Sequence, residues 1–115
     1  LAAVVVPKFT KRSEQARIVA ARTDIANLEM VLDAFEVDTG RYPSDSEGLQ
    51  ALVEQPSNIK DWRGPYLKRG VPTDPWGNTY IYKYPGEHNV DGYDLYSFGP
   101  DGQNGGGDDI DNWSN

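Results

Sequence analysis

The sequence contains no cysteine, which excludes disulfide bonds, thiolate metal sites and cysteine nucleophiles. Its one histidine, His88, lies in a run of turn-forming residues, so we expect a solvated loop residue rather than a general base. No GxSxG nucleophile motif occurs, and no apolar run reaches the roughly 20 residues of a membrane helix. With so few groups for chemistry, the sequence predicts that the protein is not an enzyme.

Positive charge is also scarce. The sequence has 11 Lys and Arg but 18 Asp and Glu, so its net charge is −7. This balance argues against a nucleic acid as partner. Residues 1–22 depart from this acidic balance, because they include five basic residues and only one acidic residue. The basic residues are Lys8, Lys11, Arg12, Arg17 and Arg22. A basic start before an acidic remainder predicts a membrane-proximal end or head-to-tail assembly. The length of 115 residues predicts one domain.

Lysine and arginine are absent from residues 91–115, a stretch with six aspartates and six glycines. Crowded carboxylates repel one another, so a folded stretch of this kind requires a cation. Hard oxygen ligands on a pliable loop favour calcium. The alternative is a disordered acidic tail. Apolar residues within the stretch favour an ordered site; they are Leu95, Tyr96, Phe98, Ile110 and Trp113. The loop lacks the ligand pattern of an EF-hand.

A short apolar run, LAAVVVP, occupies residues 1–7 ahead of the basic cluster. Six apolar residues cannot span a bilayer. We expect the run to be the end of a longer apolar segment, and the alternative is an ordinary buried or frayed helix end.

Apolar residues at spacings of three and four predict one long helix over residues 8–37. The stripe comprises Ile18, Ala21, Ile25, Leu28, Leu32 and Phe35. Gly40 is expected to end the helix. The stripe most simply packs against a sheet, with a coiled-coil seam as the alternative.

Residues 38–70 read as a loop region with one short helix over Ser46–Gln55, capped by Ser44 or Ser46. Trp62, Tyr66 and Leu67 are available to fill the core. Residues 71–115 carry strand signals at 78–84 and 94–98, and a third strand is expected near 110–113. The predicted class is α+β: a long N-terminal helix packed on a small antiparallel sheet, followed by an ordered C-terminal calcium loop.

Four segments resemble the major pseudopilins of the type II secretion system, members of the type IV pilin-like superfamily. They are LAAVVVP with the basic helix, DTGRYPSDSEGLQALV (38–53), GPYLKRGVPTDPWGNTYIYKYPG (64–86) and DLYSFGPDGQNGGGDDIDNW (94–113). The resemblance covers nearly the whole chain, and the proline-tryptophan-glycine-asparagine motif and the acidic loop carry it most specifically.

The resemblance implies a structural calcium ion in the last segment. By position, Asp101, Asp108 and Asp109 supply side-chain ligands, and main-chain carbonyls of Leu95, Ser97 and Gln103 complete the shell. Asp94 and Asp111 remain open between ligands and residues that cap loops. Trp113 is expected to seat beside the ordered loop.

The resemblance also implies a life cycle and partners. Such proteins are cleaved and N-methylated by a prepilin peptidase and held in the inner membrane by an apolar helix. Their globular domain lies in the periplasm of a Gram-negative bacterium. They polymerise into the pseudopilus with minor pseudopilins and other secretion components, and this filament drives proteins out of the cell. Arg12, Arg17 and Arg22 are candidates to pair with acidic surface of neighbouring copies, and the alternative is that they form a solvated helix face.

Two other readings stay open at this point. One is a minor pseudopilin or a type IV pilin, and the lack of cysteine argues against many pilins. The other is a free-standing calcium-binding or carbohydrate-binding module, in which Trp62 and Trp76 would stack on sugars rather than fill the core.

Overall fold

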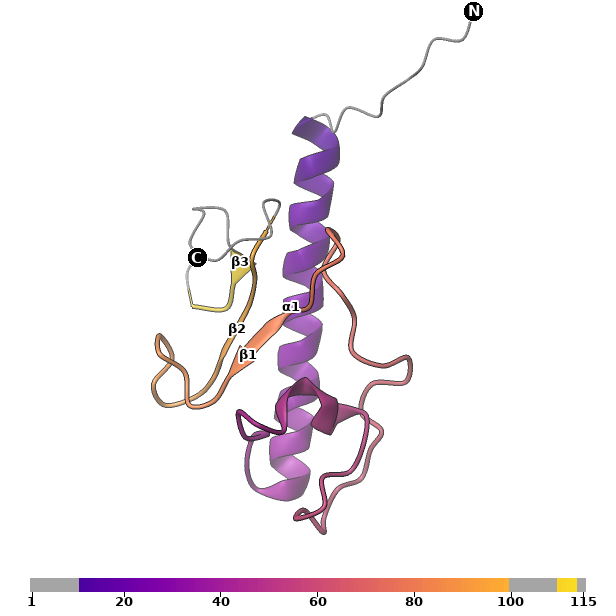
Figure 1. Ribbon diagram of the computed structural model, residues 1–115, viewed down its shortest axis with the longest axis vertical. Coiled ribbons are helices and arrows are strands. Elements are labelled where there is room, and N and C mark those ends of the chain that lie inside the picture. The colour runs from indigo at the N-terminus through magenta and orange to yellow at the C-terminus, as the bar shows by residue number, and fades with distance from the viewer. Residues whose placement is uncertain (1–10, 100–109, 114–115) are drawn as a thin grey trace, which may run out of the picture.

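One long helix forms the spine of the molecule, and a small sheet and several loops cover one of its flanks (Figure 1). The structure is a computed structural model, which describes residues 11–99 and 110–113. Along the chain come helix α1 (Lys11–Thr39), the 3-10 helix η1 (Gly48–Leu52) and strands β1 (Ile81–Lys83), β2 (Asp94–Ser97) and β3 (Ile110–Asp111). The predicted α+β class is confirmed.

Helix α1 forms because neither proline nor glycine interrupts it and because its apolar stripe has a surface to cover. Five of the six stripe residues are buried, and Ile18 is partly buried. Gly40 ends the helix as predicted, since its φ of 88° favours glycine and its N–H donates to the Glu36 carbonyl at 2.8 Å. The stripe lies in one buried cluster with Tyr82 and Leu95 of the sheet, so the prediction that it packs on a sheet is confirmed. The first three residues of the predicted range 8–37 lie outside the described residues.

Strand β2 is the centre of a three-stranded antiparallel sheet in the order β1-β2-β3. Tyr82 lies opposite Leu95 in the first pair, and Ser97 lies opposite Ile110 in the second. All four β2 residues are buried, because one sheet face meets α1 and the other is covered by loops and aromatic side chains.

All three predicted strands are shorter in the structure, and the second, expected at 94–98, ends at Ser97. The run 78–84 forms a strand only over Ile81–Lys83, because the Asp74 carboxylate holds the Asn78 amide and Thr79 makes an isolated bridge with Thr73. The third strand ends at Asp111 instead of continuing to residue 113.

A short helix lies within the predicted range Ser46–Gln55, but it is a 3-10 helix and covers only Gly48–Leu52. Gly48 has φ 62°, which an α-helix from Ser46 would not accommodate. At its other end, donors from a later loop bind the carbonyls of Ala51 and Leu52: Trp62 Nε1 donates to the former at 2.7 Å, and the Tyr66 amide to the latter at 2.8 Å. The backbone therefore makes only one 3-10 turn.

Ser44, one of the two expected caps, exchanges hydrogen bonds with Glu47 just before this turn. The Glu47 amide donates to Ser44 Oγ at 3.2 Å, and the Ser44 amide donates to Glu47 Oε1 at 2.8 Å. This reciprocal pair has the form of a capping box.

Aromatic donors tie the body to carboxylates spaced along α1. The four pairs are Trp76–Glu14 at 2.8 Å, Tyr80–Asp24 at 2.7 Å, Tyr42–Asp33 at 3.0 Å and Tyr66–Asp38 at 2.7 Å. Trp62 and Trp76 are partly buried against the core, so their expected role as core residues is confirmed. Among the described residues, no helix combines the length and apolar character needed to cross a membrane.

Candidate functional site

The proline-tryptophan-glycine-asparagine motif forms a turn organised by the buried carboxylate of Asp74. Asp74 Oδ1 accepts hydrogen bonds from the amides of Trp76 at 3.1 Å and Asn78 at 2.8 Å. The Gly77 amide donates to the Asp74 carbonyl at 2.9 Å, and Gly77 has φ 88°, where glycine is favoured. The motif thus fixes one rigid turn beside the sheet.

The other oxygen of the same carboxylate connects this turn to the start of the acidic C-terminal loop. Ser97 Oγ donates to Asp74 Oδ2 at 2.7 Å and accepts a hydrogen bond from the Gly99 amide at 3.0 Å. Ser97 has no solvent exposure, and Asp74 has 3%. The chain therefore leaves β2 in a direction set by a buried hydrogen-bond network.

The far end of the C-terminal loop returns to the same strand. Ser97 lies opposite Ile110 in the β2–β3 pair. Asn112 accepts the Leu95 amide at 2.9 Å through Oδ1 and donates through Nδ2 to the Tyr93 carbonyl at 3.2 Å. Two independent sets of hydrogen bonds hold the ends of the loop side by side.

Only part of the expected calcium site can be placed. Leu95 and Ser97 lie on β2, two residues apart, and so on the same side of the strand. The other four expected ligands, Asp101, Gln103, Asp108 and Asp109, lie outside the described residues. Within 11–99 and 110–113, no three histidine or acidic side chains gather as metal ligands. The calcium site stays a prediction.

Asp94, left open between ligand and loop cap, caps a loop. Its carboxylate accepts hydrogen bonds from the amides of Glu87 at 2.8 Å, His88 at 3.0 Å and Asn89 at 2.9 Å. Burial would raise the pKa of Asp94, but these amide hydrogen bonds outweigh it and lower the pKa. Gly86 permits this arrangement, because a Cβ there would collide with Asp94 Oδ1.

The last described residues dock on the loop that Asp94 organises. The Trp113 ring stacks on the His88 ring at 4.1 Å between centroids, with 7° between the planes, and it meets Tyr96 edge-on at 5.3 Å. The Trp113 amide donates to Asp111 Oδ1 at 3.2 Å, so Asp111 caps this turn. His88 is exposed as expected, but its ring serves as a platform rather than standing free in solvent.

The sequence interpretation missed Asp74, and it assigned no buried network to Ser97. The available signal was the aspartate directly before the proline-tryptophan-glycine-asparagine motif, because Asp often binds backbone amides of the turn that follows it.

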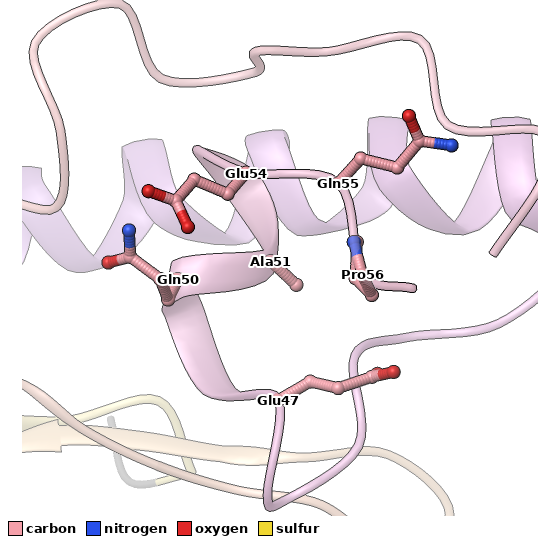
Figure 2. A pocket seen from close by; sticks show the side chains of 6 residues that line it. All are labelled: Glu47, Gln50, Ala51, Glu54, Gln55 and Pro56. Atoms are coloured by element: carbon pink, nitrogen blue, oxygen red, sulfur yellow. The ribbon is translucent and has the colours of Figure 1, made fainter. Parts of the chain in front are cut away.

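Two hollows in the described surface lack groups arranged for catalysis. One, of about 160 Å³, lies beside η1 and is lined by Glu47, Gln50, Ala51, Glu54, Gln55 and Pro56 (Figure 2). Arg41 already binds Glu47 through two hydrogen bonds of 2.8 and 3.0 Å. The other, of about 310 Å³, lies between α1 and the 67–72 loop, with Asp24, Lys68 and Arg69 on its wall.

A sequence model of the family "Type II secretion system (T2SS), protein G" matches residues 8–113. The type II secretion system core protein G of Pseudomonas aeruginosa is 44% identical over 122 residues, covering 100% of this chain and 84% of that protein. The protein of the same name from Escherichia coli K12 is 44% identical, and the match covers 98% of this chain and 79% of that protein.

A solved structure agrees with these relatives. It is the crystal structure of the major pseudopilin from the type 2 secretion system of enterohaemorrhagic Escherichia coli, 36% identical, with a TM-score of 0.80. The match covers 96% of this chain and 94% of that one. The chain therefore belongs to the type II secretion system protein G family, whose members are structural pseudopilins of that system.

Proposed function

We propose that this chain polymerises with copies of itself into the periplasmic pseudopilus, together with minor pseudopilins and other secretion components, and has no catalytic role. The carrying observation is the match to protein G over residues 8–113, which covers the helix, the sheet and the C-terminal segment alike. The first turns of α1 rise beyond the sheet, so the helix offers a lateral surface to neighbouring subunits (Figure 1).

The proposed location follows from the N-terminal segment. The apolar run at residues 1–7 precedes a basic cluster, and in this proposal it belongs to the helix that anchors each subunit in the inner membrane. The globular part then lies in the periplasm. Fractionation of cells producing the full-length protein tests this: it should sediment with the inner membrane, and recovery in the cytosol would contradict the proposal.

A calcium ion is the second part of the proposal. Asp101, Asp108 and Asp109 would hold it, with main-chain oxygens of Leu95, Ser97 and Gln103. The donor set fits, because calcium takes six to eight oxygens from carboxylates and carbonyls. The fixed base of the loop supports the fit: Ser97 is held by Asp74 on one side, and β3 returns beside it. Bound calcium would neutralise the crowded carboxylates and order this surface for assembly.

Thermal unfolding with and without calcium tests the ion. A ligand at 100 times its Kd stabilises a fold by about 2.7 kcal/mol, which for a domain of this size raises Tm by about 10 °C. The parent protein should show such a rise and lose it with a chelator, and Asp108→Ala should abolish it. Asp108→Ala should also make the loop protease-sensitive.

The matched control is Asp91→Ala, which removes an exposed carboxylate from the β1–β2 connection and should keep the calcium response. If Asp108→Ala melts at the parent's temperature in both calcium and chelator, the ion assignment is wrong. Filament formation is a separate readout. If the parent protein shows no calcium effect but still forms filaments, the calcium assignment is wrong and the filament proposal stands.

A further inference from the structure

The side chain of Trp76 connects the proline-tryptophan-glycine-asparagine turn to the first turns of α1. Trp76 Nε1 donates a hydrogen bond to Glu14 Oε1 at 2.8 Å, and the two residues are 62 positions apart in the chain. The backbone amide of the same tryptophan donates to Asp74 Oδ1 at 3.1 Å. Trp76 therefore joins the helix to the buried carboxylate that organises the turn.

The same carboxylate continues the connection to the start of the acidic C-terminal loop. Asp74 Oδ2 accepts the Ser97 hydroxyl at 2.7 Å, and Ser97 Oγ accepts the Gly99 amide at 3.0 Å. A continuous hydrogen-bond relay thus joins the loop to the helix, through Gly99, Ser97, Asp74, Trp76 and Glu14. Asp74 and Ser97, at its centre, are buried, and buried hydrogen bonds are stronger than those in water.

The loop end of this relay coincides with the proposed calcium site. The main-chain oxygen of Ser97 is one of the proposed ligands, and the side chain of the same residue donates to Asp74. An ion that fixes the Ser97 carbonyl also restricts the backbone that carries the hydroxyl. Ser97 is therefore the residue at which ion binding acts on the relay.

The helix end of the relay has few other contacts that hold it to the body. Among the side chains of residues 13–20, which the structure describes, none is buried, and burial on α1 begins at Ala21. The first turns of the helix also rise beyond the sheet (Figure 1). Helix ends with few buried apolar contacts open at low cost in free energy. The bond between Trp76 and Glu14 therefore has a large influence on how often these turns separate from the body.

We propose that the relay makes the first turns of α1 responsive to calcium. With the ion bound, the Trp76–Glu14 bond holds residues 13–20 on the body, and without the ion these turns separate from it more often. Glu14 and Trp76 act as positioning residues, and calcium regulates the stretch between the apolar N-terminal run and the globular body. This inference rests on the proposed calcium ion and names an element that the ion controls.

Hydrogen exchange of the full-length protein in detergent measures this release. In the parent, calcium should slow amide exchange of residues 13–20 about five-fold or more relative to chelator, the lower end of usual coupling between two sites. Glu14→Ala removes the acceptor, and Trp76→Phe removes the donor but keeps an aromatic ring, so each should abolish the effect. Glu14→Gln keeps an acceptor oxygen and should retain most of it. Rescue by glutamine would not follow from a general loss of helix stability.

Tyr80→Phe is the matched control. It removes a 2.7 Å hydrogen bond from Tyr80 to Asp24, which also ties the body to α1 but lies outside the relay. The variant should keep the calcium effect on residues 13–20. If Tyr80→Phe abolishes the effect as Glu14→Ala does, general loosening of α1 explains both results and the relay is overturned.

Calcium affinity provides an independent readout, because coupling between two sites is reciprocal. Glu14→Ala should weaken calcium binding by up to the same factor by which calcium slows exchange, although Glu14 is not among the proposed ligands. Glu14→Gln should bind calcium nearly as the parent does. Titration calorimetry with calcium alone measures both dissociation constants.

The outcomes separate this inference from the proposed function. If calcium raises the Tm of the parent but leaves exchange of residues 13–20 unchanged, the relay is overturned and the calcium site stands. Full retention of the exchange effect in Glu14→Ala and Trp76→Phe overturns the relay in the same way. If calcium neither binds nor raises Tm, the calcium proposal itself is wrong and the relay falls with it, whereas the filament proposal stands.

Discussion

Ser97 Oγ donates a 2.7 Å hydrogen bond to Asp74 Oδ2, and both side chains are buried. The two residues are 23 positions apart, one in the turn before β1 and the other at the end of β2. Because Asp74 also holds the amides of its own turn, and Ser97 also holds the Gly99 amide, one carboxylate couples two loops. The entry to the acidic C-terminal segment is therefore positioned by the proline-tryptophan-glycine-asparagine motif.

Replacing Ser97 tests this coupling. Ser97→Ala leaves a buried carboxylate oxygen without its donor and the Gly99 amide without its acceptor, so we expect a loss of about 1.5–3 kcal/mol in unfolding free energy. Urea unfolding measures the loss, and the exposed Ser57→Ala serves as control with little change. Equal midpoints for the two variants would show that the hydrogen bond contributes nothing.

The sequence predicted the helix better than it predicted this network. Periodicity identifies the buried stripe because Leu28, Leu32 and Phe35 recur at helical spacing. Gly40 was also predictable, because a glycine can adopt the positive φ that commonly ends a helix. The Asp74–Ser97 contact has no local pattern, since it joins a turn to the end of a strand 23 residues later. Its existence follows from tertiary packing that periodicity does not encode.

Gly86 offers a sharp steric prediction. A Cβ at residue 86 would collide with Asp94 Oδ1 and lie 2.8 Å from the Asn89 carbonyl, so Gly86→Ala must displace the carboxylate from its three amides. We expect a loss of about 2 kcal/mol or more in unfolding free energy. Gly92→Ala is the matched control in the same connection, because nothing lies within 4 Å of its added Cβ. Similar stability of both variants would contradict the prediction.

Arg41 and Glu47 give a pH-dependent prediction. The guanidinium hydrogen bond lowers the pKa of Glu47 from 4.5 to about 2, so the folded state binds this proton more weakly than the unfolded state. The stability it contributes is complete above pH 4.5 and is lost as pH falls toward 2. We expect about 1 kcal/mol from this partly exposed pair. Urea unfolding across this pH range should show a shallower decline for Glu47→Gln than for the parent, and parallel curves would contradict the assignment.

Not every apolar residue of α1 is buried, and the local sequence does not show which ones are. Only the structure separates Leu32, which is buried, from Met30, which is 70% exposed. The short helix is shorter than predicted for a related reason, because local sequence does not show the later donors that bind the Ala51 and Leu52 carbonyls.

His88 and Trp113 give the last prediction, which concerns how the C-terminus is held. Their rings stack at 4.1 Å between the 85–92 connection and the turn after β3, and such aromatic pairs contribute about 0.5–1.5 kcal/mol beyond area burial. A double-mutant cycle with His88→Ala and Trp113→Leu should return a coupling energy of that size from urea unfolding.

Trp113→Leu alone should also make the C-terminal segment more sensitive to limited proteolysis, because its contact with Tyr96 is lost with the stack. The control cycle replaces His88→Ala by Val90→Ala, an exposed residue of the same connection without a ring. That control should be additive within about 0.5 kcal/mol. Additivity in the His88 cycle as well would mean that the stacked rings are neighbours without mutual stabilisation, and that other contacts, among them the β2–β3 pairing and the Asn112 hydrogen bonds, hold residues 110–113.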